Sequence, residues 1–495
     1  MKRIAILPLV ILALSSAFAF AETKTFIKEY TYQASEDDSK NSSRTIAIRE
    51  VKRLLLEELG TYLESETAVK NFQLTKDQVT AFTAGIVKTD VLDQKWDGDS
   101  LKYWLKAKIT ADSDDVIKSI EALRQDRVKT KEREELKKRS DELLRENATL
   151  RKELTAAKGE TRQKRKVDYD ENIKKLTAIE WLEKGLSLSM SENYQGAIDA
   201  FSKAIERNPK LSGAYNNRGI IYYILDDSEK AIADFNRELK LKPKDTVAYL
   251  NRGNVYAKTG NHNEAMEDYN QAMKIDPKFD AAYNNRGLVY DTIGNYKEAI
   301  EDFSKAIKFN PKYAEAYFNR GNTYGKLRDN KQALEDYDRA IELHPQYADV
   351  YVNRGAVYGA LGNYKQAIKD YSMAIQINPR IAMAYNNRGF ANTALGNNNQ
   401  AMEDFTTAIK LDPKLEMAYN NRGVVYSKVG DHNRAISDFD RAIELNPQDA
   451  GAYLNRGLAY RDLGNINQSI QDMQIAARLG LKWAQDYLRE RGDVW

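Results

Sequence analysis

The chain has 495 residues, of which 42% are hydrophobic, and its 76 basic and 73 acidic residues leave a formal net charge of +3. This near balance gives no overall electrostatic attraction to nucleic acid or to an anionic membrane surface. The sequence contains no cysteine, which excludes disulfides, a thiolate nucleophile, a thiolate zinc site and a lipid-modified cysteine.

The first 21 residues predict an export signal. Two basic residues precede an apolar run from Ile4 to Leu14, and Ala-Phe-Ala at 19–21 closes the segment. A basic start, a short apolar run and small residues before the cleavage point are typical of a cleaved signal peptide. The alternative is an uncleaved anchor, but the run is short for a bilayer and contains Pro8. We therefore expect export to a bacterial periplasm or cell envelope, without a membrane span after cleavage.

Residues 22–111 predict a small α+β domain. Residues 25–33 are rich in aromatic and β-branched side chains, as strands are. Segments 86–96 and 101–109 flank the Asp-Gly pair at 97–98, which indicates a hairpin. Between these strands, apolar residues recur every three or four positions and predict an amphipathic helix. They are Ile48, Val51, Leu55, Leu59 and Tyr62.

Two further features of this domain are local. Thr75 and Gln78 form a capping-box pattern for a short helix that Gly85 would end. Trp104 stands among lysines in the second hairpin strand, where we expect a half-exposed strand residue rather than a ligand contact.

Residues 112–158 predict a charged helix. Leu136, Leu143 and Leu150 lie seven residues apart, and Asn147 takes another core position of the same heptad. Two interpretations are open. The first is a parallel homodimer through 129–158, in which the core asparagine fixes the register. The second is a solvated single helix used as a spacer. Gly159 is predicted to end this helix, and 159–177 to form a basic linker, because the run at 162–166 is too short for a nucleic-acid footprint.

A 34-residue period dominates the rest of the chain. Its invariant mark is a glycine, at 185, 219, 253, 287, 321, 355, 389, 423 and 457, and every proline after Pro8 follows the same spacing. Tyr283, Tyr290, Ala299, Phe303 and Ala306 show the other recurrent small and aromatic positions in one unit. The pattern resembles the tetratricopeptide repeat, here in nine copies over 178–481.

The resemblance implies a mainly α fold, a right-handed α-solenoid of helix-turn-helix units with a concave groove. The small α+β domain and the charged helix would precede this solenoid. Residues 482–495 would form a capping helix, with Trp483 and Leu488 covering the last repeat.

With the glycine counted as position 8, repeats two to nine carry arginine at position 7, where the family usually prefers a leucine-like residue. The same eight repeats carry aspartate at position 23, whereas the first repeat has Lys184 and Ala200 and lacks both. This joint presence and absence predicts structural ion pairs between facing helices, in preference to ligand binding. Examples are Arg286 with Asp302 and Arg354 with Asp370.

Position 6 of the same repeats is always asparagine. The residues are Asn217, Asn251, Asn285, Asn319, Asn353, Asn387, Asn421 and Asn455. The resemblance implies that this position borders the groove, and some family members hold an extended peptide backbone with such a ladder. An amide suits that task because it both donates and accepts hydrogen bonds. The alternative is that these asparagines bond between neighbouring repeats.

Positions 5, 9 and 12 are expected to face the groove as well, and they are largely uncharged. Asn284, Phe318 and Phe390 are examples, and they favour a neutral, partly apolar peptide as ligand. The three histidines, His262, His344 and His432, have no spacing for a metal site or a catalytic triad. The sequence thus predicts a protein-binding scaffold rather than an enzyme, without cofactor or metal. The alternative function is a structural spacer of the cell envelope with no discrete peptide site.

Overall fold

The computed structural model describes residues 23–65, 87, 89–112, 116, 127–492 and 494. The predicted signal segment and the predicted short helix at 75–85 lie outside these residues. The chain divides into two compact units, Met1–Glu264 and Ala265–Trp495.

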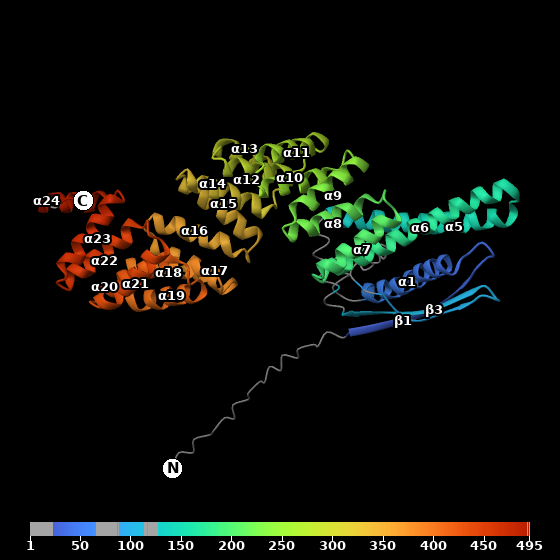
Figure 1. Ribbon diagram of the computed structural model, residues 1–495, viewed down its shortest axis with the longest axis horizontal. Coiled ribbons are helices and arrows are strands. Elements are labelled where there is room, and N and C mark those ends of the chain that lie inside the picture. The colour runs from blue at the N-terminus through green and yellow to red at the C-terminus, as the bar shows by residue number, and fades with distance from the viewer. Residues whose placement is uncertain are drawn as a thin grey trace, which may run out of the picture. The chain divides into compact units, whose positions relative to one another are not determined.

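The first unit begins with a three-stranded antiparallel sheet in the order β1-β3-β2. The predicted hairpin is confirmed, since β2 pairs with β3 from Thr89 opposite Ile109 to Asp97 opposite Lys102. One helix, α1, lies against the sheet (Figure 1). The bounds are β1 Thr23–Gln33, α1 Lys40–Ser65, β2 Thr89–Asp97 and β3 Lys102–Asp112.

Alternation along β3 separates a buried face from an exposed one. Tyr103, Leu105 and Ile109 are buried against Val51 and Leu55 of α1, part of the predicted apolar stripe. Side chains on the opposite face of β3, including Trp104, remain half-buried. This is the arrangement expected for a sheet with one solvated face.

A helical hairpin follows, made of α5 (Arg127–Ala156) and α6 (Gly159–Met190), which run side by side in Figure 1. The prediction of a basic linker over 159–177 is therefore wrong, because these residues form the first half of α6. Tyr169, Asn172 and Leu176 of this segment are buried, whereas residues 162–164 of its basic run are exposed. The second half of α6 is the first helix of the first repeat.

The apolar heptad residues of α5 pack against other elements of the same chain. Leu143 packs against Leu176 and Ile179 of α6, and Leu154 enters the core beneath the sheet. The structure thus gives the apolar seam an intrachain partner. A parallel homodimer through this segment would have to replace that packing, and it stays a prediction.

An ion cluster fixes α1 to α6. Arg49 Nη1 lies 2.9 Å from Glu183 Oε1, and Lys52 Nζ lies 2.5 Å from Glu183 Oε2. Burial by itself would raise the pKa of Glu183, but Arg49 and Lys52 outweigh it and lower the pKa to about 2. The N-terminal domain is therefore docked on the first repeat rather than tethered to it.

Paired antiparallel helices make up the remaining chain. In the first unit they are α7 Tyr194–Arg207, α8 Ser212–Ile224, α9 Ser228–Leu241 and α10 Thr246–Lys258, and α11 spans His262–Ile275. In the second unit they are α12 Asp280–Thr292, α13 Tyr296–Phe309, α14 Ala314–Lys326, α15 Asn330–Leu343, α16 Ala348–Ala360, α17 Tyr364–Ile377, α18 Ala382–Ala394, α19 Asn398–Leu411, α20 Glu416–Lys428, α21 His432–Leu445, α22 Ala450–Asp462, α23 Ile466–Arg478 and α24 Lys482–Arg491.

The recurrent glycine marks a close contact between the two helices of a repeat. A Cβ on Gly287 would lie 2.8 Å from the ring of Phe303, and one on Gly355 would lie 2.8 Å from the ring of Tyr371. Such distances are too short for a methyl group, so only glycine lets the aromatic residue of the second helix approach this closely.

The last helix, α24, covers the final repeat in part as predicted. Leu488 is fully buried with Met473 and Ala484. Trp483, predicted to share this role, is 48% exposed and stacks on Tyr487, with ring centroids 5.4 Å apart. The prediction for Trp483 is therefore wrong. Among the described residues, no helix has the length and apolar character needed to cross a membrane.

Candidate functional site

Position-7 arginines each donate two hydrogen bonds to the position-23 aspartate of the same repeat. Arg286 Nε donates to Asp302 Oδ2 over 2.6 Å, and Nη2 donates to Oδ1 over 2.8 Å. This bidentate geometry is the strong form of an arginine–carboxylate pair. It occurs in Arg218–Asp234, Arg286–Asp302, Arg320–Asp336, Arg354–Asp370, Arg388–Asp404, Arg422–Asp438 and Arg456–Asp472.

The third guanidinium nitrogen, Nη1, reaches position 25 in the second helix of the preceding repeat. Arg320 donates to Ser304 Oγ over 2.9 Å, and Arg354 donates to Asp338 Oδ1 over 2.6 Å. Each arginine thereby joins two layers. Sequence reasoning missed position 25, although every residue there carries a side-chain oxygen. These acceptors are Ser202, Asn236, Asn270, Ser304, Asp338, Ser372, Thr406 and Asp440.

Tyrosine rings cover the arginines. The guanidinium of Arg354 lies 5.6 Å from the ring centroid of Tyr351, within the range of a cation–π contact. Burial by itself would lower the pKa of Arg354, but Asp370 and Asp338 raise it above its ordinary value. Arg354, with two carboxylate partners and an aromatic cover, has little capacity left for a ligand, which favours a structural role for this pair.

The position-6 asparagines form a hydrogen-bonded ladder along the first helices of the repeats. Where position 5 of the preceding repeat is asparagine, the position-6 amide donates to it, as Asn319 Nδ2 does to Asn284 Oδ1 over 3.1 Å. The same bond joins Asn251 to Asn216, Asn421 to Asn386 and Asn455 to Asn420. These amides therefore bond between neighbouring repeats, as the second interpretation of the sequence proposes.

The ladder has exceptions. Asn217 Nδ2 donates to the backbone carbonyl of Gly213 over 2.8 Å. Asn285 Oδ1 accepts from Asn284 Nδ2 over 3.0 Å. Asn353 Nδ2 donates to Asn322, at position 9 of the preceding repeat, over 2.8 Å. The ladder thus adapts to whichever acceptor its neighbour offers.

Exposed apolar side chains lie beside the ladder in the second unit. At positions 2 and 9 of the first helices, Leu288 is 39% exposed, Met383 36%, Phe390 54% and Met417 42%. We call the surface formed by positions 2, 5, 6, 9 and 12 of the first helices the ladder face.

Other predicted groove residues are packed. Asn284 is 2% exposed and bonds to two asparagines. Phe318 is half-buried, with its ring centroid 5.0 Å from that of Tyr347. Of these three predicted contacts, Phe390 alone presents an exposed ring.

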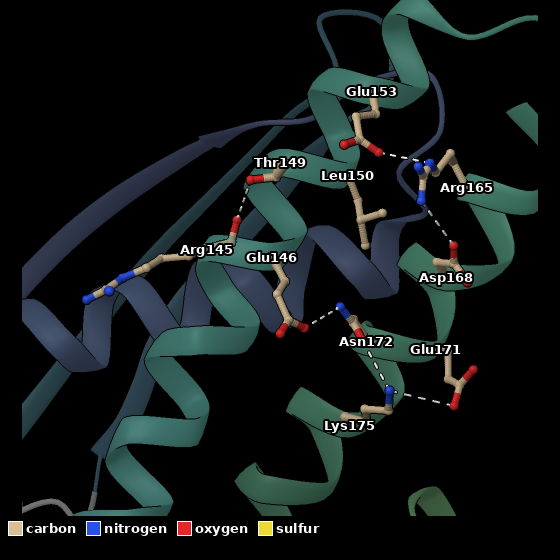
Figure 2. A pocket seen from close by; sticks show the side chains of 10 residues that line it. All are labelled: Arg145, Glu146, Thr149, Leu150, Glu153, Arg165, Asp168, Glu171, Asn172 and Lys175. Carbon is tan, nitrogen blue, oxygen red and sulfur yellow. Dashed lines mark hydrogen bonds and ion pairs between the residues drawn. The ribbon is translucent and has the colours of Figure 1, made fainter. Parts of the chain in front are cut away.

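The N-terminal unit contains a separate cleft between α5 and α6, with a volume of about 550 Å³. Figure 2 shows Glu146 facing Asn172 across it and Arg165 between Glu153 and Asp168. Because these groups satisfy one another, the lining favours no particular ligand charge. The ten lining residues are Arg145, Glu146, Thr149, Leu150, Glu153, Arg165, Asp168, Glu171, Asn172 and Lys175.

The histidines lie at the ends of three different helices. His262 and His432 are the first residues of α11 and α21, and His344 follows α15. In the part of the chain that the structure describes, no group of three histidine or acidic side chains is placed to hold a metal ion.

Tandem helical hairpins joined by repeated interlayer bonds define an α-solenoid of helix-turn-helix units. Models of the tetratricopeptide repeat match residues 182–246, 253–294, 292–327, 314–347, 348–381, 391–430, 417–449 and 439–471. The chain belongs to the tetratricopeptide repeat family, whose fold typically serves as a non-catalytic scaffold.

Similar solved structures include three with repeat arrays shorter than this chain. MamA protein is 30% identical over 34% of this chain and 92% of its own, with a TM-score of 0.31. YrrB, described as a TPR protein with an unusual peptide-binding site, is 25% identical over 37% of this chain and 95% of its own, with a TM-score of 0.32. A tetratricopeptide repeat protein from Parabacteroides merdae ATCC 43184 is 21% identical over 49% of this chain and 97% of its own, with a TM-score of 0.41. No curated protein matches the chain.

Proposed function

We propose that this protein is an exported scaffold that binds a partner polypeptide along the ladder face of its repeats. The observation that carries the proposal is the exposure of Leu288, Met383, Phe390 and Met417 next to a row of half-buried amides. Exposed apolar side chains that recur at equivalent positions of several repeats are consistent with an extended interaction surface. An amide that keeps a donor or acceptor unused within the chain suits a peptide backbone, which needs both.

A second candidate function rests on the ladder itself. Position-6 amides donate to an asparagine of the preceding repeat at Asn251, Asn319, Asn353, Asn421 and Asn455, and such a network holds consecutive repeats in register. This observation favours a structural spacer in an envelope assembly, with no discrete peptide site. The two functions differ in whether the exposed apolar residues are needed for binding.

Affinity capture from an envelope extract of the source organism separates them. The bait is the chain from Glu22 onward, as wild type, as Phe390→Ala and as Leu361→Ala. Leu361 is a matched control because it is also 54% exposed but lies at the C-cap of α16, at position 14 of its repeat and outside the ladder face. We expect a partner that the wild type and Leu361→Ala retain and that Phe390→Ala loses. Equal retention on all three baits contradicts the proposal and favours the spacer.

Export is tested by the N-terminus of the native protein. Mass spectrometry of the envelope fraction is expected to find a mature chain that starts at Glu22, as the small residues at 19–21 indicate. A chain found only in the cytoplasm would contradict export, and an intact N-terminus in the membrane fraction would indicate an anchor.

A further inference from the structure

Among the described residues, the ladder lacks an inter-repeat hydrogen bond between α16 and α18. We call this position the open rung, and a position where that bond is made a filled rung. Asn387 has no acceptor at either place where other ladder amides find one, because Val352 and Ala356 occupy positions 5 and 9 of the preceding repeat. Asn387 Oδ1 accepts from Asn386 Nδ2 over 3.1 Å, but Asn387 Nδ2 donates to no described residue. The side chain of Asn387 is half-buried.

The hydroxyl of Tyr371 is open at the same junction. In the preceding repeat, Tyr337 donates to Asn322 Oδ1 over 2.8 Å, and the same oxygen accepts from Asn353. Ala356 replaces that asparagine in the next repeat, so the Tyr371 hydroxyl bonds to no described residue. One alanine thus frees two polar groups at once.

Tyr371 directs this hydroxyl at the ladder face. The side chain of Tyr371 is 4% exposed. Its hydroxyl would lie 3.8 Å from a Cβ added to Gly359, which stands at repeat position 12 on α16. Burial raises the pKa of Tyr371 above its ordinary value, so the phenol keeps its proton. A protonated phenol both donates and accepts hydrogen bonds.

An apolar wall borders the two open groups. Phe390 is 54% exposed and Met383 36% exposed on α18, and positions 9, 12 and 13 of α16 hold the small residues Ala356, Gly359 and Ala360. Positions 5, 6, 9, 12 and 13 of α16 and α18 hold no charged side chain. The surroundings therefore suit an uncharged apolar side chain rather than a carboxylate or a cation.

We propose that the open rung is the site at which the ladder face anchors an extended polypeptide, an inference that rests on the proposed function. Asn387 Nδ2 donates to a backbone carbonyl of the ligand, and Tyr371 Oη accepts from a backbone N–H. The adjoining apolar side chain of the ligand packs on Phe390 and Met383. Filled rungs are less suited to this role, since one N–H of each amide is already bonded within the chain.

The test uses peptides selected from a random display library against the chain from Glu22 onward, with affinities measured by titration calorimetry. Ala356→Asn places at this junction the residue that fills the preceding rung, and it leaves Phe390 and Met383 unchanged. We expect peptides selected on the wild type to bind Ala356→Asn at least tenfold more weakly. Tyr371→Phe is expected to weaken binding several-fold and to fold normally, because phenylalanine occupies the same position at 201, 235, 303, 405 and 439.

Tyr337→Phe is the matched control, because it removes the same hydroxyl from a filled rung, and its peptide affinity is expected to equal that of the wild type. Peptides that bind wild type, Ala356→Asn and Tyr371→Phe equally would overturn the open rung but leave binding by the ladder face standing. A wild-type chain that selects no peptide would overturn the proposed function as well.

Discussion

Arg354 holds Asp370 and Asp338 at the same time, one in its own repeat and one in the repeat before. Its Nε and Nη2 donate to both oxygens of Asp370 over 2.8 and 2.7 Å, and its Nη1 donates to Asp338 Oδ1 over 2.6 Å. The side chain of Asp370 is 4% exposed, whereas that of Asp338 is 54% exposed. The two carboxylates therefore contribute very differently to stability.

Removal of Arg354 is expected to destabilise the array strongly. Arg354→Leu leaves the Asp370 carboxylate buried without its partner, which costs about 3 kcal/mol of the free energy of unfolding. Asp338→Ala is expected to cost less than about 1 kcal/mol, because an exposed ion pair contributes little. Urea denaturation measures both losses. Arg354→Leu combined with Asp370→Ala should recover part of the stability, and an unchanged loss in the double variant would contradict this account.

The repeat period made most of this fold predictable. The 34-residue spacing gives equivalents of Gly355 in all nine repeats and equivalents of Arg354 and Asp370 in repeats two to nine, so one repeat predicts its neighbours. The first repeat has Lys184 and Ala200 and lacks both the arginine and the aspartate, and this joint absence indicates the ion pair from the sequence alone. Position 25 was missed because its residues share an oxygen atom but not an identity.

Departures from periodicity were not predictable in the same way. The charges at 162–166 favour a solvated linker when only the sequence is considered. The burial of Tyr169, Leu176 and Ile179 depends instead on tertiary packing, as Leu176 and Ile179 show against Leu143 of α5. The open rung could not be predicted either, because only the structure shows that Asn322, the position-9 residue equivalent to Ala356, accepts from both Tyr337 and Asn353. The effect of a single substitution in a repeat depends on which hydrogen-bond partners in neighbouring repeats it removes.

The turn at Arg328 offers a stabilising substitution. Its φ is 60°, in the left-handed region, at a repeat position where Gly294 and Gly362 have φ of 83° and 75°. Side chains other than glycine cost about 1 kcal/mol in this conformation. Arg328→Gly is therefore expected to raise the midpoint of thermal unfolding, measured by circular dichroism. Lys331→Gly, inside α15, is the control that should lower it.

Stability of the N-terminal unit is expected to depend on pH through Glu183. Its pKa in the folded chain is about 2, below its ordinary 4.5, so the ion cluster with Arg49 and Lys52 stabilises fully above about pH 4.5. That contribution is lost as the pH falls from 4.5 to 2, and it amounts to about 3 kcal/mol. Denaturation of the wild type and of Glu183→Gln should therefore give free energies of unfolding that converge over this window. Parallel pH profiles would show that Glu183 is not the titrating group.

Asn147 provides a test of how α5 is used. The side chain is 3% exposed, and in the described structure neither Oδ1 nor Nδ2 has a hydrogen-bond partner. An unsatisfied buried amide costs about 1–3 kcal/mol, so Asn147→Leu is expected to raise the melting temperature of the intact chain without changing its molar mass. In a parallel dimer the same asparagine would bond to its counterpart and fix the register, and its replacement would then alter the oligomeric state. Light scattering alongside thermal unfolding separates the cases, since a changed molar mass assigns α5 to a dimer and a higher melting temperature at constant mass assigns it to the hairpin with α6.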